Sequence, residues 1–405
     1  MSGDWEKCQF AVVTALPKEF AAMLAMLDDT RPITVPGDPN DYAFGKVPAI
    51  DGTGHHHVVV ALQKKPANNS ASAVASHLAH SFPHLEHVLM VGIGGGVPHA
   101  ADADKHVRLG DVVVSDQNGV VQYDHLKVES EQVLVRSAAS PPSAALLGRV
   151  RILEAARLAG GCPWEEHIAL AIVEGATRPD TSTDRLFVAG VETPHPIDAY
   201  RRSGQPRIHY GPIGSSNALL KDPEIRDALR DKFGVRAIEM EASGIADGTW
   251  TAGLGYIIIR GISDYCDQHK NDVWQGYAAV AAAGYARALI ESFTVITDPV
   301  TQRQLHDAEA KMDAAHAALD TNDFDTAAQC AEAGADLAMA AGDKDLERRT
   351  ILQAVRAWGE HMGCQHLQEA DIAATSKRAR KLVERLQTLG ERPGICPGVG
   401  ATGPL

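Results

Sequence analysis

The stretch "HVLMVGIGGGV" at residues 87–97 decides the fold, because an apolar run passes there directly into a series of glycines. The apolar half is typical of a buried β-strand, and glycines at the carboxyl end of a strand let the backbone approach a ligand closely. The spacing differs from the dinucleotide-binding pattern GxGxxG, and Pro98 prevents a helix from starting at once. Taken alone, a loop around Gly94 and Gly95 could equally bind a ligand or form a tight structural turn.

Apolar, strand-like runs alternate with helical patterns on both sides of this stretch. Further strands are expected at 8–16, 55–63, 110–116, 167–175, 207–216, 234–242 and 255–264. Helices are expected at 17–29, 69–83 and 274–293. This alternation predicts an α/β fold, in which a mostly parallel or mixed sheet is flanked by helices.

The composition changes after about residue 297. Alanine, leucine, glutamate and lysine then dominate, so a run of about four helices is expected. The stretch 322–338 resembles a tetratricopeptide helix pair, but a capped helical bundle fits the pattern equally well. We therefore expect an α/β domain at 1–297, an all-α domain at 298–390 and a flexible, Gly- and Pro-rich tail at 391–405.

The charge and cysteine content exclude several classes of protein. A formal net charge of −14 over 405 residues disfavours a general binder of nucleic acid or of membrane surfaces, which needs a basic face. The six cysteines are scattered, without a CxxC pair, which disfavours a disulfide framework or a zinc site. No signal-peptide core and no run of about 18 apolar residues is present, so we expect a cytoplasmic protein without metal or cofactor.

Three acidic residues follow apolar strands, where the carboxyl ends of neighbouring strands meet. Glu19 comes after the first strand, Glu241 after a late strand, and Asp264 ends the segment "RGISD". A lone acid at a strand end is commonly a helix cap or a solvated loop residue, whereas three beside a glycine loop favour one common cleft. Arg260 and Ser263 of the same segment could hold Asp264 in position.

Four motif blocks resemble, in the right order, those of the nucleoside phosphorylase and nucleosidase superfamily: "TALPKEF", "VGIGGGV…LGDVVVSD", "AIEMEASGIA" and "RGISDYCD". Other segments resemble the branch fused to repeat or signalling domains in immune-type proteins: "GVVQYD", "RPDTSTDRLF", "IHYGPIGSSN…KD" and "HKNDVWQGYAAVAAAGYA". The resemblance covers residues 10–295 and implies the superfamily's mixed sheet together with N-glycosidic chemistry.

The resemblance implies a sugar-binding role for the "EME" block. Glu241 would bind the 2′- and 3′-hydroxyls of a ribose, because one carboxylate can accept both hydroxyl hydrogens. Met240 would pack on the sugar, and Gly94 and Gly95 would lie near the base and the sugar. Glu239 would face the protein interior instead.

The resemblance also assigns the groups that act on the bond. Asp264, with Ser263 beside it, would protonate or hydrogen-bond N7 of the leaving purine, and Glu19 would activate water. Phosphorylases of the superfamily carry an arginine and a serine or threonine around the first loop glycine to hold phosphate. Met90 and Ile93 stand there in this chain, which favours a hydrolase over a phosphorylase.

Other residues would decide the 5′ group of the substrate. Thioadenosine-type nucleosidases line that end with apolar residues, whereas a nucleotide requires cations. Arg178 and Arg185 of "ATRPDTSTDRLF", with Lys64 and Lys65, could supply them, although charged loop residues are usually only solvated. If these side chains converge, the substrate would be AMP, ATP or a related nucleotide.

The resulting hypothesis is an enzyme that hydrolyses the N-glycosidic bond of a purine nucleoside or nucleotide, with adenine as the favoured base. It would release the free base, act as an immune-type nucleotide-depleting effector, form a homo-oligomer and contact a protein partner through its C-terminal helices. Two alternatives stay open: a nucleoside-sensing module without turnover, and a methylthioadenosine or adenosylhomocysteine nucleosidase.

Overall fold

The computed structural model describes residues 4–50, 52, 54–128, 133–135, 141–294, 299–341, 343–362 and 369–389. Contacts within the chain divide it into two compact units, Met1–Val295 and Ile296–Leu405. The tail predicted at 391–405 lies outside the described residues.

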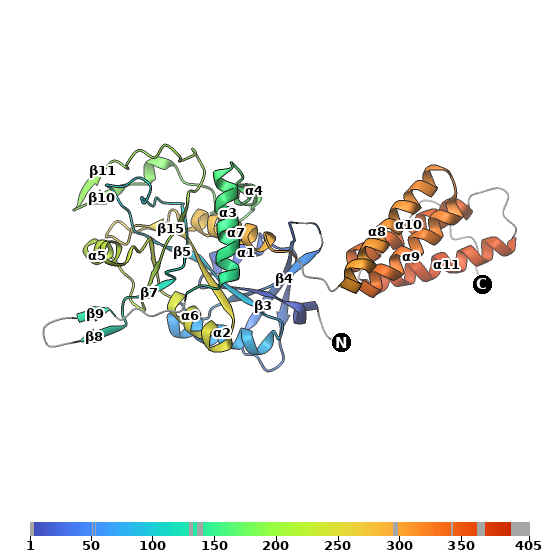
Figure 1. The fold of residues 1–405 in the computed structure, drawn as a ribbon, viewed down its shortest axis with the longest axis horizontal. Helices are drawn as coiled ribbons and strands as arrows, with labels where there is room; N and C mark the ends of the chain where they lie inside the picture. Colours follow the sequence, from blue (N-terminus) through green and yellow to red (C-terminus); the bar gives the residue numbers. More distant parts are fainter. Residues whose placement is uncertain are drawn as a thin grey trace. The chain divides into compact units, whose positions relative to one another are not determined.

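The first unit is built on a mixed sheet flanked by helices, as predicted (Figure 1). Its strands are β1 (Phe10–Thr14), β2 (Asp28–Thr34), β3 (Asp41–Pro48), β4 (His55–Leu62), β5 (His87–Gly96), β6 (Val112–Val114), β7 (Val120–Gln122), β8 (Leu126–Val128), β9 (Val133–Val135), β10 (Leu186–Val188), β11 (Val191–Thr193), β12 (Ile208–Tyr210), β13 (Ile213–Ser215), β14 (Ala237–Glu239) and β15 (Gly255–Asp264). Its helices are η1 (Asp4–Lys7), α1 (Pro17–Leu24), α2 (Asn68–Ser81), α3 (Ala144–Leu158), α4 (Pro163–Leu170), η2 (Thr181–Thr183), α5 (Pro223–Phe233), α6 (Ala242–Ala252) and α7 (Gln275–Glu291).

The main path of the sheet runs β12-β6-β15-β5-β1-β4-β3-β2, and its centre is parallel. The central strands β1, β5 and β15 are almost continuously apolar, and nearly all their residues are buried. Such strands are covered on both faces: α2 and α6 pack together, while α7 packs on β15 and β5 and is itself covered by α1 and α4 (Figure 1).

The strands β5 and β15 continue well beyond the end of β1, and this extension positions the candidate site. Gly94 of β5 pairs with Ile262 of β15, and Gly95 pairs with Asp264 after a shift in register. The last glycines of β5 also pair antiparallel with β14. The loop predicted around Gly94 and Gly95 is therefore wrong, because both glycines pair with β15, Gly95 also pairs with β14, and β5 continues through them.

Two other local predictions are also wrong. The strand predicted at 167–175 is helix α4 up to Leu170, since Pro163 in the first turn and two acidic residues after it favour a helix start. The helix predicted at 17–29 ends at Leu24. The edge strand β2 follows, and its largely exposed residues give no alternating apolar signal.

Within its described residues the second unit contains helices joined by turns and no strand, as predicted. It consists of α8 (Pro299–Asp320), α9 (Phe324–Ala341), α10 (Lys344–Met362) and α11 (Glu369–Thr388). The helix α9 packs on both α8 and α10, and α10 also packs on α11. Alanines and Trp358 fill its core, so the helices approach closely. Among the described helices of the chain, none has the length and apolar content needed to cross a membrane.

Candidate active site

A buried cluster of three glutamates and one arginine lies at the carboxyl edge of the central strands; we call Glu19, Glu239, Glu241 and Arg260 the carboxylate cluster. Glu19 comes from the first turn of α1, the other glutamates from β14 and the start of α6, and Arg260 from β15. Each of the four is at most 5% exposed. The three carboxyl groups outnumber the single cation, Arg260, so the cluster would carry a net negative charge if all four groups were ionised.

Glu19 is held by backbone groups on both sides. Its Oε2 accepts N–H bonds from Ala15 and Leu16, each at 2.8 Å, and its Oε1 accepts the N–H of Ile93 at 2.7 Å. Burial raises the pKa of the Glu19 carboxyl, and Arg260 and these N–H groups only partly oppose it. A fixed carboxylate with a raised pKa is well suited to take a proton from water near neutral pH.

Glu239 and Glu241 have different roles although they stand two positions apart. The carboxylate of Glu239 accepts the N–H groups of Glu241 and Ala242 at 2.9–3.0 Å, so it caps the start of α6, and it pairs with Arg260 Nη2. Glu241 Oε2 lies 3.1 Å from the same Nη2. Burial raises the pKa of Glu241; Arg260 opposes this, and Glu239 and Glu19 add to it.

The glycines of β5 make room for this cluster. A Cβ on Gly92 would overlap the carboxylate of Glu19 and the guanidinium of Arg260, and a Cβ on Gly95 would overlap Cys266 Sγ. Gly94 is less constrained, with Ile238 O at 3.1 Å from a Cβ built there. The glycines at 92 and 95 are thus required by the side chains packed against the strand.

Asp264 lies at the end of β15 and is 4% exposed. Its Oδ1 accepts the Cys266 N–H at 2.9 Å, and its Oδ2 lies 3.1 Å from Ser263 Oγ, which is 3.4 Å from Gly94 O. Lys270 Nζ lies 2.9 Å from the same Oδ2. The sequence analysis missed Lys270; its only local signal is a lysine in the loop that directly follows the "RGISD" segment.

Asn68, at the start of α2, is a second residue that the sequence analysis missed. Its Oδ1 accepts the Gly244 N–H and the Ser215 hydroxyl, both at 3.1 Å, and thereby ties α2 to α6 and β13. Its Nδ2 is buried and has no acceptor among the described residues. Its backbone N–H donates to Asn217 Oδ1 at 3.1 Å. No sequence motif marks Asn68, because all these partners are distant in the chain.

The cationic residues considered for a 5′-phosphate have separate surroundings. Arg185 is exposed and makes a two-point ion pair with Glu192, at 2.9 and 2.5 Å. Arg178 lies over the rings of Trp274 and Tyr277, with its Cζ 5.2 and 4.9 Å from their centroids. Lys64 Nζ donates to the carbonyl of Pro39 at 2.7 Å. Met240, the candidate for packing on the sugar, is half-buried and stands between Glu239 and Glu241 in the sequence.

A cavity of about 800 Å³ opens beside the backbone groups that hold Glu19. Ala15 and Leu16 form one wall, and Phe20, Tyr42 and Leu62 make much of the lining apolar. A cavity of this size holds a nucleoside-sized molecule.

The sequence of the first unit matches a known family. The family model of the phosphorylase superfamily matches residues 9–294, so the chain belongs to that superfamily, and the predicted family is confirmed.

Three curated relatives are similar to parts of the chain. A nucleotide-binding leucine-rich repeat (NLR)-like protein of Hyaloscypha variabilis is 33% identical over 304 residues, which cover 69% of this chain and 28% of that protein. The ATP nucleosidase Cap17 of Escherichia coli is 27% identical over 279 residues, covering 67% and 49%. A 5′-methylthioadenosine/S-adenosylhomocysteine nucleosidase of Marinomonas sp. is 24% identical over 273 residues, covering 67% and 92%. The match thus spans half or less of the first two relatives' length.

Proposed function

We propose that the chain hydrolyses the N-glycosidic bond of a purine nucleoside or nucleotide and releases the free base. The observation that carries this proposal is the buried meeting of Glu19, Glu241 and Arg260 beside Asp264. Two of the relatives are named nucleosidases, which supports the same chemistry.

The proposed reaction divides between the two ends of the scissile bond. The C1′–N9 bond breaks with its electron pair moving to the purine, and Asp264, or the Lys270 ammonium paired with it, donates a proton to the base. Glu241 holds the ribose hydroxyls, so that C1′ is fixed as it gains positive charge. Water then bonds to C1′, and Glu19 takes the proton that the water loses.

Water is favoured over phosphate as the nucleophile. Met90 is fully buried in β5, between β1 and β15, and offers nothing to a phosphate dianion. The N–H of Ile93 is occupied by Glu19. Neither of the positions that hold phosphate in phosphorylases therefore provides a donor in this chain.

The relative of Marinomonas sp., which is named a 5′-methylthioadenosine/S-adenosylhomocysteine nucleosidase, supports a second candidate for the 5′ group. Such a substrate carries a thioether in place of a phosphate chain. In this alternative the chain is a methylthioadenosine or adenosylhomocysteine nucleosidase with the same catalytic groups.

Wider features of the protein are also proposals. We take 1–297 as the catalytic domain, 298–390 as a helical domain that contacts a protein partner, and 391–405 as a flexible tail. We also propose a cytoplasmic homo-oligomer that depletes nucleotides in an immune-type response; the relative named an ATP nucleosidase supports a nucleotide as the substrate. The free thiols of the described cysteines fit a reducing compartment.

The test is release of free base in phosphate-free buffer from adenosine, AMP, ATP, methylthioadenosine and guanosine, with Asp264→Asn beside the wild type. Base released from a purine substrate by the wild type and lost in the variant supports the proposal. Release from methylthioadenosine alone selects the second candidate. Binding of a nucleoside without any release would support the sensing module instead.

A further inference from the structure

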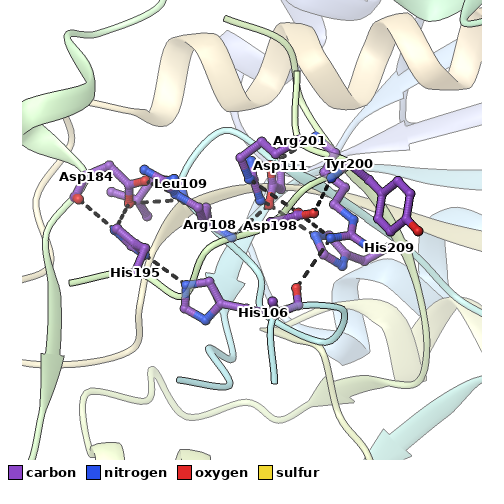
Figure 2. Close-up of polar contacts among 12 residues, drawn as sticks. His106, Arg108, Leu109, Asp111, Asp184, His195, Asp198, Tyr200, Arg201 and His209 are labelled. Carbon is purple, nitrogen blue, oxygen red and sulfur yellow. Dashed lines mark hydrogen bonds and ion pairs between the residues drawn. The ribbon is translucent and has the colours of Figure 1, made fainter. Parts of the chain in front are cut away.

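A buried polar network joins residues 106–111 to residues 184–209 and uses none of the proposed catalytic groups (Figure 2). Asp111 is its first anchor. It accepts hydrogen bonds from Nη1 and Nη2 of Arg201, at 2.7 and 2.6 Å, and lies 3.1 Å from His209 Nε2. Burial acts to raise the pKa of Asp111, but Arg201 and His209 outweigh it and hold this pKa well below its usual range. Arg201 is thereby fixed in one orientation.

Asp184 is the second anchor of the network. It accepts Arg108 Nε at 2.7 Å and the Tyr265 hydroxyl at 2.6 Å. Tyr265 directly follows Asp264, so this anchor ties Arg108 to the end of β15. Arg108, like Arg201, is therefore held in place by a buried carboxylate.

Two neutral histidines complete the network beside Asp184 (Figure 2). His106 Nδ1 accepts the His99 N–H at 3.2 Å, so its Nε2 carries the hydrogen that it donates to His195 Nδ1 at 2.8 Å. His195 Nε2 then donates to the Asp184 carbonyl at 2.8 Å. Burial lowers the pKa of both rings, that of His106 to about 3, which keeps both acceptor nitrogens free of protons.

The arginines of this network face a cavity of about 460 Å³. We call it the arginine cavity, because its wall contains Arg108, Arg178, Arg201 and Arg202. Thr181, Ser203 and Gln205 add neutral polar groups to the same wall. A cluster of guanidinium groups is unusual in a chain whose formal net charge is −14.

Several donors on this wall lack a close acceptor. Arg178 Nε and Nη1 and Arg201 Nε are buried without a close hydrogen-bond acceptor among the described residues; Arg178 also interacts with the Tyr277 hydroxyl, and Arg201 Nε lies 3.8 Å from Asp198 Oδ2. Arg178 contacts the rings of Trp274 and Tyr277 and makes no ion pair with a described carboxylate. Buried guanidinium donors without close acceptors are costly, and the positive charge of Arg178 is not offset by any described carboxylate.

The acidic residues near the cavity are already paired. Asp198 lies on the wall, but it forms ion pairs with Arg207 and, at 3.8 Å, with Arg201 Nε. Glu165 forms an ion pair with the guanidinium of Arg202. The charge of Arg178 is thus left to attract a ligand.

We propose that the arginine cavity binds the polyphosphate chain of a nucleotide. Guanidinium groups bind phosphate oxygens through paired N–H bonds, and several of them match a chain that carries several charges. Because Arg108 and Arg201 are fixed by Asp184 and Asp111, little side-chain freedom is lost on binding. The bound polyphosphate could belong to the substrate or to a second, regulatory nucleotide.

The test is isothermal titration calorimetry with inorganic tripolyphosphate as the probe. The wild type binds it, and Arg178→Gln weakens the binding about tenfold or more, since the unpaired guanidinium is removed. Arg185→Gln is the matched control, because it removes a charge of the same segment that is exposed and already paired with Glu192. Equal affinity of the wild type and Arg178→Gln, equal loss in both variants, or no binding by the wild type would overturn the proposal.

A second variant guards against a folding defect in Arg178→Gln. Ser203 is exposed on the cavity wall, so Ser203→Asp adds a negative charge without removing a buried contact. Its thermal unfolding should match that of the wild type, while its affinity for tripolyphosphate should fall by a similar factor. Unchanged affinity in this folded variant would contradict the proposal.

Turnover assays identify the source of the polyphosphate. If the polyphosphate belongs to the substrate, tripolyphosphate competes with ATP, and Arg178→Gln raises KM for ATP but not for adenosine. If it belongs to a regulatory nucleotide, tripolyphosphate binds without competing with the substrate. If the protein binds tripolyphosphate but releases no base from any substrate, the proposed function is contradicted, while the proposal that the arginine cavity binds polyphosphate is supported.

Discussion

The carboxylate cluster and the arginine cavity both contain charged groups within one domain, but carboxylates prevail in the first and arginines line the second. In the first, three glutamates surround Arg260, and burial raises the pKa of Glu19 and Glu241. In the second, Arg108, Arg201 and Arg202 each pair with a carboxylate, whereas Arg178 makes no ion pair with a described carboxylate. Under the two proposals, the carboxylate cluster holds and moves protons, whereas the arginine cavity receives an anion.

The largest expected effect comes from removing the proposed base of the carboxylate cluster. Glu19→Gln keeps the shape of the side chain but cannot take a proton from water, so kcat for base release should fall by about 10²–10⁴-fold. KM should change little, since the sugar contacts remain. Glu192→Gln, an exposed glutamate paired with Arg185, serves as the control. A Glu19→Gln enzyme with more than a third of wild-type kcat would contradict the assignment.

The next largest effect is expected from replacing Arg260, the single cation of the carboxylate cluster. Arg260→Gln leaves buried carboxylates without their partner, and it should lower the free energy of unfolding by about 3–5 kcal/mol. Arg185→Gln breaks an exposed pair and should cost less than about 1 kcal/mol. Urea unfolding of both variants measures the difference. A similar small loss in the two would show that Arg260 does not hold the cluster together.

A smaller effect is expected where the backbone touches the cluster. Gly92→Ala places a Cβ against Glu19 and Arg260, so it should destabilise the fold by about 1–3 kcal/mol. Gly148→Ala, in helix α3, meets no atom within 4 Å and should stabilise by about 0.5–1 kcal/mol. Opposite signs in urea unfolding are the predicted result, and equal values would mean that β5 can relax away from the cluster.

The smallest effect is a pH dependence whose sign differs between the two regions. The lowered pKa of His106 and His195 means that their contribution to stability is present above pH 6.5 and is lost as the pH falls towards 3. The raised pKa of Glu19 and Glu241 gives the reverse: stability is fully present below pH 4.5 and is lost as the pH rises through the raised values.

The histidine half of this prediction is measured by thermal unfolding between pH 5 and 7. His106→Gln keeps a donor near the position of Nε2 but does not titrate, so its unfolding temperature should fall less on acidification than that of the wild type. His84→Gln changes a histidine outside the network and is the control. An equal fall in His106→Gln and the wild type would refute the role of the pair.

The sequence predicts the carboxylate region well because its signals are local. Glu19, Glu241 and Asp264 each stand at the end of an apolar strand, and motif and strand occur in one short segment. The family and the flanked mixed sheet are confirmed for the same reason. The roles given to the individual site residues stay predictions until variants are assayed.

The arginine cavity could not be predicted in the same way. Its wall is assembled from residues 108, 178–181 and 195–205, which no motif connects. Arg178 and Arg185 look alike in sequence, yet one lies on Trp274 beside the cavity and the other is paired on the surface. A contact of long sequence separation places Arg178 on Trp274, and such contacts also explain why Asn68 was missed. Lys270 lies close to Asp264 in the chain, but no motif marked it.

The central claim is that water, activated by Glu19, attacks the sugar. The most direct measurement is mass spectrometry of the sugar product after base release in buffer that contains inorganic phosphate. The account predicts free base with the free sugar, in the same amount with and without phosphate. A sugar 1-phosphate, formed only when phosphate is present, would contradict it.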